Sequence, residues 1–408
     1  MVIIMTATER FLDYVTFDTQ SDPMSKTHPS SEKQKKLGAH IADEWREIGL
    51  SDVFQDEYGC VYGALPATEG MEGAKVTGLI AHMDTSPDMP GENVKAHVVR
   101  YGGGDIVLNE EKGVVMRAAE FSHLERYRGQ ELIVTDGTTL LGADDKAGAA
   151  EITAALARIA GNPSLRHARI PVCLTTDEEI GQGADFFDQK RFAADWAYTV
   201  DGGALGEIEY ENFNAASARV TVHGVNIHPG EAKNKMKNAA RLAVELVNLL
   251  PPAETPEHTE GYEGFYHLSE MIGSEEKAVL GFIIRDHDLE KFEARKKVME
   301  RAVAYLNDKY GAGSFTLEMR DTYYNMREKI LPHMHLIARA KEAMRKAGVE
   351  PICVPIRGGT DGARLSWEGL PCPNLSTGGH NFHGRFEYIP VQSLERMTDV
   401  LVHLVSEG

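Results

Sequence analysis

Histidine and carboxylate side chains recur at the ends of short apolar runs along this chain of 408 residues. They lie in the segments Ala81-His82-Met83-Asp84, Gly142-Ala143-Asp144-Asp145-Lys146, Thr176-Asp177-Glu178-Glu179, Thr199-Val200-Asp201-Gly202-Gly203 and Gly379-His380-Asn381-Phe382-His383-Gly384. In a parallel α/β sheet the carboxyl ends of the strands converge on one crevice. We therefore expect these side chains, distant in the sequence, to form one metal site.

Part of this set matches the ligands of a site with two divalent metal ions. Such a site needs a bridging carboxylate, plus a histidine and a carboxylate or so for each ion. The candidates are His82, Asp144, Glu179, Asp201 and His383. Three carboxylate charges against two Zn²⁺ leave one positive charge, which a bound hydroxide neutralises. The ligand set therefore suits the activation of water.

Two further acids have spacings that suggest supporting roles. Asp84 stands two residues after His82, as expected if it accepts the second N–H of the imidazole and fixes the ring. Glu178 and Glu179 are adjacent, so in extended backbone they point to opposite sides. One of them can bind metal while the other takes a proton from water.

Each of these signals is weak when it is taken singly. A lone His-x-Asp is more often a surface pair or a satisfied core histidine, and Glu-Glu is usually a solvated turn. Asp144-Asp145 after a glycine is also typical of a helix N-terminus, and Asp201-Gly202-Gly203 of a plain turn. The functional interpretation is favoured because all of these groups stand at strand ends, in an order that fits one site.

The elements that would position these residues alternate between strand and helix in the first half. Strands are expected at residues 76–81, 170–175 and 197–200, and helices at 31–48 and 146–160. This alternation predicts an α/β fold with a doubly wound, mixed but mostly parallel sheet. A Gly- and charge-rich insertion between Thr85 and Leu132 is expected to form a hairpin excursion.

The pattern changes after about Asn214. Strands are expected at 216–222, 264–272, 278–285 and 315–320, with helices at 236–250 and 289–306. The order βαββαβ is that of a small ferredoxin-like sheet. We therefore predict a catalytic domain in two parts, 1–213 and 324–408, with an inserted α+β lid or dimerisation domain at 214–323. A helix at 331–346 and a strand at 351–356 are expected in the second part.

Composition limits the class of partner and the compartment. The net charge is −19, with 62 acidic and 43 basic residues, which opposes binding to nucleic acid or to an anionic membrane. The four cysteines are scattered, and no segment has the length and apolarity of a membrane span or a signal peptide. The cytoplasm is the expected compartment.

The motifs resemble the di-zinc exopeptidases that include glutamate carboxypeptidase and aminoacylase, and within them the peptidase T branch. The resemblance spans nearly the whole chain. It rests on His82-Met83-Asp84-Thr85-Ser86-Pro87-Asp88, Gly142-Ala143-Asp144-Asp145-Lys146-Ala147-Gly148, Asp177-Glu178-Glu179-Ile180-Gly181, Tyr198-Thr199-Val200-Asp201-Gly202-Gly203, Phe213-Asn214-Ala215-Ala216, His228-Pro229-Gly230, Thr259-Glu260-Gly261-Tyr262-Glu263-Gly264-Phe265-Tyr266, Tyr323-Tyr324-Asn325-Met326 and Arg357-Gly358-Gly359-Thr360-Asp361-Gly362. It implies a cytoplasmic enzyme with two zinc ions that releases the N-terminal residue from tripeptides.

The resemblance also implies a role for each site residue. It places one zinc on His82, Asp144 and Asp201, and the other on Asp144, Glu179 and His383. Glu178 becomes the general base that activates a metal-bridging hydroxide, and Asp84 orients His82. The first acid of the Asp-Asp pair is the bridge in that family, so Asp144 is preferred to Asp145.

The chain departs from the family at both ends. Relatives often carry tyrosine where this chain has His380, which gives the last motif two candidate ligands. His383 is preferred because it matches the family's His-Gly pair followed by Glu387, and His380 is expected to line the pocket. Residues 1–4 look like an extension relative to relatives, and Met5 is an alternative start.

Substrate recognition is expected from His228, Arg285 and Arg357. The histidine of the family that His228 matches stabilises the tetrahedral oxyanion, although a loop histidine before proline needs no such role. Arg285 ends a strand and could grip the terminal carboxylate of a tripeptide bidentately, or serve only as an ion-pair partner. Arg357 and its neighbouring glycines could bring backbone donors to the substrate, but a Gly-rich turn alone is poor evidence.

Other functions remain open at this point. The same site would serve a carboxypeptidase or an N-acyl amino acid deacylase. A non-enzymatic metal-binding protein would need the ligands but not the base Glu178, which argues against it. A single-unit insert further suggests a homodimer in which His228 enters the partner's site, the alternative being hinge closure near Asn214 and Tyr324.

Overall fold

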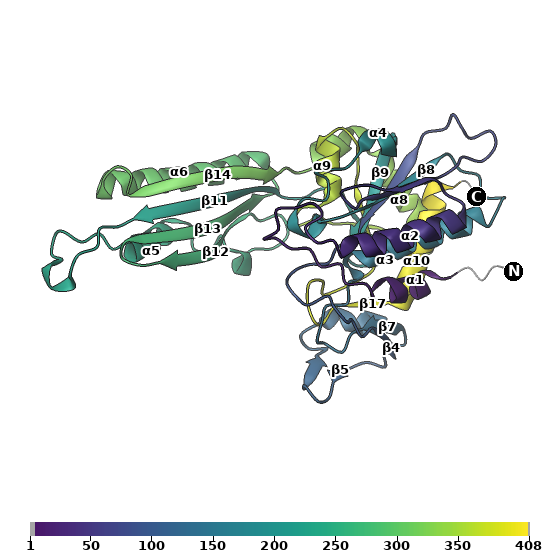
Figure 1. Ribbon diagram of the computed structural model, residues 1–408, viewed down its shortest axis with the longest axis horizontal. Coiled ribbons are helices and arrows are strands. Elements are labelled where there is room, and N and C mark those ends of the chain that lie inside the picture. Colours follow the sequence, from purple (N-terminus) through teal and green to yellow (C-terminus); the bar gives the residue numbers. More distant parts are fainter. Residues whose placement is uncertain (1–4, 407–408) are drawn as a thin grey trace. The chain divides into compact units, whose positions relative to one another are not determined.

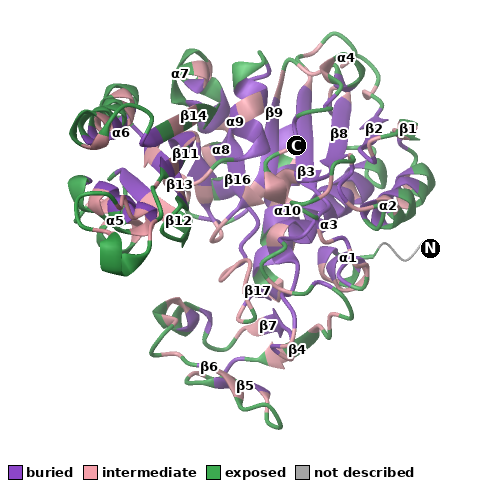
Figure 2. Ribbon diagram, turned by 60° about the vertical axis from the view of Figure 1, so that its left-hand side comes forward, coloured by how far each residue is buried: buried purple, intermediate pink, exposed green. Residues whose placement is uncertain are grey.

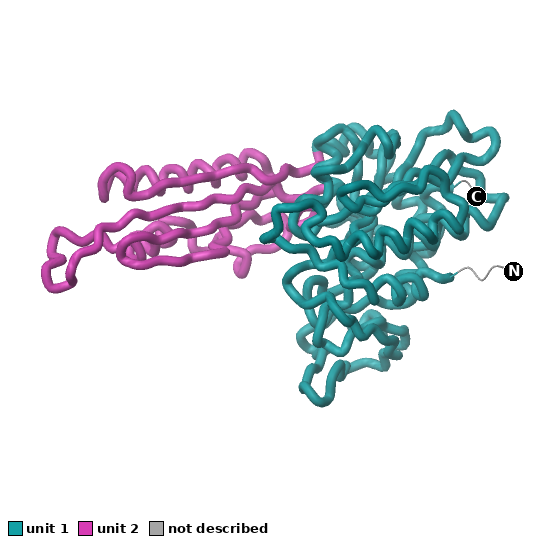
Figure 3. The backbone as a smooth tube through the Cα atoms, in the orientation of Figure 1, with its two compact units in different colours: residues 1–210, 328–354, 360–408 teal, residues 211–327, 355–359 magenta. Residues whose placement is uncertain are grey.

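The computed structural model describes residues 5–406, so the expected extension at residues 1–4 lies outside the described residues. The chain forms two compact units, coloured separately in Figure 3. The first unit comprises Met1–Tyr210, Glu328–Val354 and Thr360–Gly408, and the second comprises Glu211–Arg327 and Pro355–Gly359. No helix within residues 5–406 has the length and apolar character needed to cross a membrane.

The first unit contains a mixed, mostly parallel sheet of eight strands (Figure 1). In spatial order these are β1 (Ser51–Gln55), β2 (Val61–Leu65), β8 (Ile170–Thr175), β3 (Thr77–His82), β9 (Trp196–Gly202), β16 (Asn374–Ser376), β10 (Glu207–Glu209) and β15 (Ile352–Cys353). The central strand β3 runs parallel to both neighbours, β8 and β9. Every residue of β3 and β8 is buried (Figure 2), as their continuous apolar runs require.

Helices surround this sheet. They are α1 (Ala7–Tyr14), α2 (Gln34–Ile48), α3 (Ala143–Ala160), α4 (Gln189–Phe192), α7 (Arg327–Ile330), α8 (His335–Lys346), α9 (Asp361–Trp367) and α10 (Val391–Val405), with 3-10 turns η1 (Ser122–Tyr127), η2 (Glu178–Ile180) and η5 (Leu331–His333). The helix α3 packs on β3 and β9. Gly148 permits this approach, because a Cβ there would lie 1.9 Å from the carbonyl oxygen of Val200.

The insertion between β3 and α3 forms a small satellite of the first unit. Its strands β4 (His97–Arg100) and β7 (Glu131–Val134) join β17 (Tyr388–Pro390) in a three-stranded sheet, and β5 (Ile106–Asn109) pairs with β6 (Val114–Met116) as a hairpin. The cluster beneath includes Tyr101, Leu124 and Tyr388, all buried. This packing ties the insertion to the segment after His383.

The second unit has the predicted order βαββαβ. Its elements are β11 (Asn214–His223), α5 (Ala239–Leu249), β12 (Phe265–Gly273), β13 (Lys277–Asp286), α6 (Leu289–Tyr310) and β14 (Phe315–Tyr323), with the turns η3 (Pro229–Glu231) and η4 (Pro256–His258). The four strands form an antiparallel sheet in the order β12-β13-β11-β14. Alternate residues of β13 are buried, because one face of the sheet packs on the apolar side chains of α5 and α6.

Candidate metal centre

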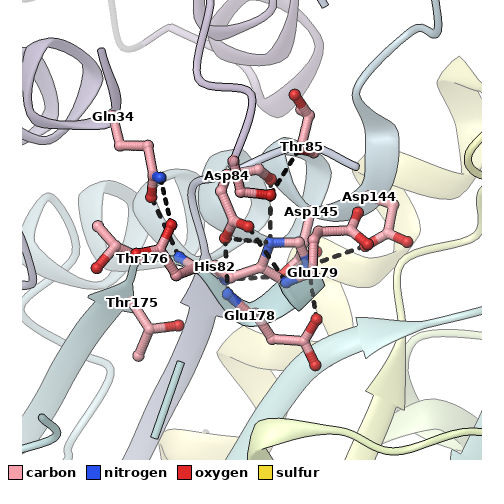
Figure 4. A network of polar contacts seen from close by, with 12 residues as sticks. Gln34, His82, Asp84, Thr85, Asp144, Asp145, Thr175, Thr176, Glu178 and Glu179 are labelled. Atoms are coloured by element: carbon pink, nitrogen blue, oxygen red, sulfur yellow. Dashed lines mark hydrogen bonds and ion pairs between the residues drawn. The ribbon is translucent and has the colours of Figure 1, made fainter. Parts of the chain in front are cut away.

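The predicted site residues converge where three adjacent parallel strands end. His82 is the last residue of β3, Asp201 is the penultimate residue of β9, and Glu178 and Glu179 lie in η2, which follows β8. The fourth carboxylate, Asp144, comes from the first turn of α3, and His383 comes from the loop before β17. Figure 4 shows His82 and Asp84 beside the turn that carries both glutamates.

Asp144 lies between the two imidazoles, with one oxygen facing each. Its Oδ1 is 2.9 Å from Nε2 of His82, and its Oδ2 is 3.2 Å from Nε2 of His383. Asp201 Oδ1 lies 3.3 Å from His82 Nε2, and Glu179 Oε2 lies 2.9 Å from His383 Nε2. Ligand atoms of a tetrahedral zinc with bonds of about 2.0–2.1 Å are separated by roughly 3.3 Å. The spacing therefore fits two ions that share the Asp144 carboxylate.

Asp145 also comes close to His82 and Asp201, but its oxygens are already engaged. They accept hydrogen bonds from the backbone N–H of His82 at 3.1 Å and of Gly148 at 3.2 Å. The oxygens of Asp144, by contrast, face the imidazole nitrogens. The oxygens of Asp144 are therefore better placed than those of Asp145 to be shared between two ions, and Asp145 anchors the end of β3 to the start of α3.

Asp84 is fully buried and serves two partners. Its carboxylate lies 3.3 Å from Nδ1 of His82, and the same nitrogen is 3.1 Å from the backbone carbonyl of Asp84. The two carboxylate oxygens also accept the backbone N–H groups of Glu178 at 3.0 Å and of Glu179 at 3.2 Å. Asp84 thus fixes the ring of His82 and the turn of the two glutamates together, and only the first of these contacts was foreseen from the sequence.

The electrostatics of the cluster favour bound cations. Burial, with repulsion from Asp144, raises the pKa of Glu179 to about 8, and burial with the same neighbour raises the pKa of Asp201 to about 7. Burial and Asp201 also raise the pKa of Glu178 well above its usual range. Glu179 Oε1 is buried without a hydrogen-bond partner. Divalent cations would offset this repulsion and satisfy the orphaned oxygen, so the donor set fits the two metals inferred from sequence.

Glu178 has a different position from Glu179. Its nearest approach to His82 Nε2 is 4.0 Å, whereas Glu179 contacts His383 directly. The left-handed backbone at Asp177, with φ of 62°, starts the turn that separates the two side chains. The buried carboxylate of Asp177 holds this turn by accepting hydrogen bonds from Ser30 and Gln34.

His380 lies in an aromatic stack rather than among the candidate ligands. Its Nε2 is 2.6 Å from the hydroxyl of Tyr127, and its ring stacks on His123 at 4.7 Å and on Tyr388 at 5.0 Å. Burial lowers the pKa of His380 to about 3. The neutral ring therefore packs the His383 loop against the insertion. His383 Nδ1 faces Asp88 at 3.3 Å, a contact that the sequence analysis did not assign.

A second contact missed from the sequence fixes the turn that carries Asp144. The buried carboxylate of Glu387 accepts four backbone N–H groups, which are those of Leu141 at 2.7 Å, Gly142 at 2.9 Å, Ala143 at 2.7 Å and Asp144 at 3.2 Å. Gly142, the residue at the N-cap, has no side chain that could accept these N–H groups. Glu387 supplies a negative charge there from the other end of the chain.

The three expected substrate-binding residues belong to the second unit. His228 is exposed, and its Nδ1 accepts the backbone N–H of Gly230 at 3.2 Å. Arg285 donates to the carbonyl of Arg357 at 2.9 Å, while its Nε is buried without a partner. Arg357 donates to the backbone carbonyls of Gly261 and Glu263 and to Thr259. Arg285 therefore has donor capacity to spare, and Arg357 mainly shapes the loop at residues 259–263.

A mixed sheet that gathers histidines and carboxylates, together with a second α+β unit, defines a metallopeptidase of the M20 type. Residues 210–314 match the family model of the peptidase dimerisation domain of the M20 group. In the solved structures the fold resembles an aminopeptidase PepT from Bacillus cereus, with a TM-score of 0.77, 24% identity and coverage of 98% of this chain and 97% of that one. It also resembles a tripeptidase from Staphylococcus aureus, with a TM-score of 0.76, 21% identity and coverage of 98% and 96%.

Sequence relatives narrow this class further. Peptidase T of Halothermothrix orenii is 55% identical over 398 residues, which cover 97% of each chain. Peptidase T of Caldanaerobacter subterraneus is 54% identical over the same length and coverage. This chain belongs to the peptidase T family, which confirms the resemblance inferred from the motifs, and it is a metallopeptidase.

Proposed function

We propose that this protein is an aminopeptidase that removes the N-terminal residue of tripeptides, with zinc as the metal at both positions. The observation that carries the proposal is the Asp144 carboxylate between two imidazoles, with the Glu178 carboxylate 4.0 Å from the imidazole of His82. The name of the Staphylococcus aureus tripeptidase supports the substrate length. Zinc is supported by the mixture of imidazole and carboxylate ligands.

The residues divide the chemistry between them. Two divalent ions held by His82, Asp144, Glu179, Asp201 and His383 would polarise the scissile carbonyl and make water at the site more acidic. Glu178 takes the proton from the attacking water and returns it to the leaving amine. Asp84 keeps Glu178 in place through the backbone N–H of that residue.

Arg285 is proposed to bind the terminal carboxylate of the tripeptide. Its guanidinium lies 5.9 Å from the ring centres of Phe265 and Tyr323, and its side chain is half-buried. These two aromatic rings beside the guanidinium restrict its orientation and reduce its hydration, which suits bidentate binding of a carboxylate. Arg357, whose donors are taken by the 259–263 loop, would help by fixing Arg285 through its carbonyl.

The second unit is proposed to be a ferredoxin-like lid and dimerisation domain, inserted into a doubly wound catalytic domain. The support is the match of residues 210–314 to a peptidase dimerisation domain. In a homodimer, the exposed His228 would enter the partner's site and stabilise the oxyanion. Mixing His228→Ala protein with Glu178→Ala protein tests this, because mixed dimers would regain one intact site. If no peptidase activity returned after verified subunit exchange, the result would favour hinge closure that brings His228 to the site of its own chain.

The deciding experiment for the substrate is a panel of peptides of two, three and four residues with free and blocked ends. We expect cleavage of the free tripeptide, with loss on N-acetylation because an aminopeptidase requires the free amine. Cleavage of the N-acetylated peptide instead would favour the alternative, a carboxypeptidase or N-acyl amino acid deacylase. Glu178→Gln is the matched control, expected to keep both metals while turnover falls about 10²–10⁴-fold.

We also propose a cytoplasmic location. The four cysteines, Cys60, Cys173, Cys353 and Cys372, are all free thiols, as a reducing compartment maintains them.

A further inference from the structure

A cavity with no role in the chemistry above lies in the first unit, where β3 and β8 begin. Its volume is about 420 Å³, within the range of about 300–1,000 Å³ that is usual for small-molecule sites. Thr77 and Ile170, the first residues of the two strands, line it together with α8 and the last turn of α10. His82 ends β3, and the rise of a six-residue strand separates the two sites by roughly 16 Å. A ligand in the cavity therefore could not contact the metal centre.

The lining of this cavity is strongly basic. Its titratable side chains are Lys75, His167, Arg169, Arg339, Lys346 and His403, against one acid, Glu342. The chain as a whole carries a net charge of −19. Even with both histidines neutral, two lysines and two arginines outnumber the single acid of the lining, which indicates a local positive field that attracts anions.

The two arginines are held in place by neutral acceptors. Arg169 donates to the carbonyl of Phe192 at 3.0 Å, and Arg339 donates to the carbonyl of Leu404 at 3.0 Å and to the hydroxyl of Thr77 at 3.4 Å. Within residues 5–406, neither arginine forms an ion pair, although Lys75 and Lys346 pair with Asp195 and Glu342. Backbone carbonyls thus orient both guanidinium groups while leaving their charges uncompensated, which is the arrangement needed to bind an oxyanion bidentately.

We propose that this basic cavity binds a small molecule carrying phosphate or carboxylate groups, with Arg169 and Arg339 as the anchors. Lys75 and Lys346, each paired with one acid, and the two histidines complete the polar lining. Because the cavity contacts the starts of β3 and β8, the C-terminal part of α8 from Arg339 to Lys346 and the end of α10, an anion there would link these elements. Binding should therefore show as increased thermal stability of the first unit.

The test is titration calorimetry of inorganic phosphate, and separately of succinate, into the metal-loaded protein. Arg169→Gln/Arg339→Gln should weaken binding about tenfold or more. The control Arg46→Gln, which removes an exposed arginine paired with Asp43 on α2, should bind as wild type does. Tighter binding of phosphate than of succinate assigns a phosphate compound as the ligand, and the reverse assigns a dicarboxylate. Equal affinity of the double variant and wild type for both anions would overturn the proposal.

Phosphate bound to the metals is distinguished by repeating the titration after the metals are removed with a chelator. Binding at the basic cavity should survive this treatment, and its disappearance would overturn the proposal. A second variant keeps the test valid if the double variant does not fold. Glu342 is exposed and its carboxylate is the one acid of the lining, so Glu342→Gln should tighten anion binding a few-fold. Unchanged or weaker binding by this variant would also contradict the proposal.

Discussion

Replacing Asp84 by asparagine should weaken metal binding without blocking folding. The carboxylate accepts two backbone N–H groups, from Glu178 and Glu179, on separate oxygens. Asparagine has one acceptor oxygen, so one N–H would face the amide NH₂ in a fully buried position. A buried unpaired donor costs about 1–3 kcal/mol. Loss of such an orienting partner typically lowers metal affinity 10–100-fold, and the two figures agree in free energy.

The structure also indicates where this loss should appear. The ring of His82 keeps a second acceptor, the backbone carbonyl of Asp84. The backbone N–H of Glu179 has no such replacement when the amide NH₂ takes the place of Oδ2. The metal position that includes Glu179 should therefore weaken more than the one that depends on His82 and Asp201. Stepwise zinc competition with a fluorescent chelator measures both affinities, and urea unfolding of the apo-protein measures stability.

Asp88→Asn is the matched comparison. Asp88 faces the other imidazole, that of His383, but its side chain is 67% exposed, so water can replace its contact. We expect a change in zinc affinity of less than about threefold for this variant. If Asp84→Asn retained zinc affinity within about threefold of wild type, the structural role assigned to Asp84 would be wrong.

Further predictions concern the metal loop, the buried acids and the second unit. His383→Ala should lose one of the two metals, whereas His380→Phe should keep both because His380 contacts Tyr127, His123 and Tyr388; metal analysis that showed the reverse would exchange their roles. Glu151 is fully buried with both oxygens unpaired, and burial, aided by Glu395, raises its pKa well above the usual range. In the unfolded chain Glu151 ionises near pH 4.3, whereas in the folded protein it stays protonated to a higher pH. The free energy of unfolding is therefore greatest below about pH 4.3 and falls as the pH rises toward the folded-state pKa. Glu151→Gln should therefore be more stable than wild type by about 1–3 kcal/mol at neutral pH, with the gain vanishing near pH 4; urea unfolding at both pH values checks this, and a gain independent of pH would contradict it. Arg285→Ala should lower kcat/KM for the tripeptide by an amount equivalent to about 1.5–3 kcal/mol of transition-state stabilisation. It should also reduce the preference for the tripeptide with a free carboxylate over the amidated tripeptide. An unchanged preference between acid and amide would show that another group holds the carboxylate.

The strands were predictable where an uninterrupted apolar run is buried on both faces. β8 has the predicted bounds, Ile170–Thr175, and all six of its residues are buried. Predictions were less accurate where the chain is exposed or contains proline. The helix expected from residue 331 begins at His335, because Leu331–His333 forms a 3-10 turn around Pro332. The strand expected at 351–356 shortens to Ile352–Cys353, which are exposed at the edge of the sheet.

The convergence of His82, the Glu178–Glu179 turn and Asp201 could be predicted because strand ends carry it. The supporting contacts could not be predicted in the same way, since they join segments that no local pattern relates. Glu387 lies 246 residues after Leu141, whose N–H it accepts. Tyr127 lies 253 residues before His380, to which it bonds. Sequence spacing identifies groups that can do chemistry, but the partners that hold them depend on the folded topology.

The segment that carries His383 and Glu387 makes several of these supporting contacts to the candidate metal centre. His383 contacts Asp144 through its imidazole, and Glu387 fixes the backbone that carries Asp144. Both belong to the stretch before and within β17, which pairs with β7 of the insertion. The Tyr127–His380 bond joins the same stretch to η1. The insertion, which supplies no candidate metal ligand within the described residues, therefore supports Asp144, because movement of this stretch would displace the side-chain and backbone contacts of Asp144 together.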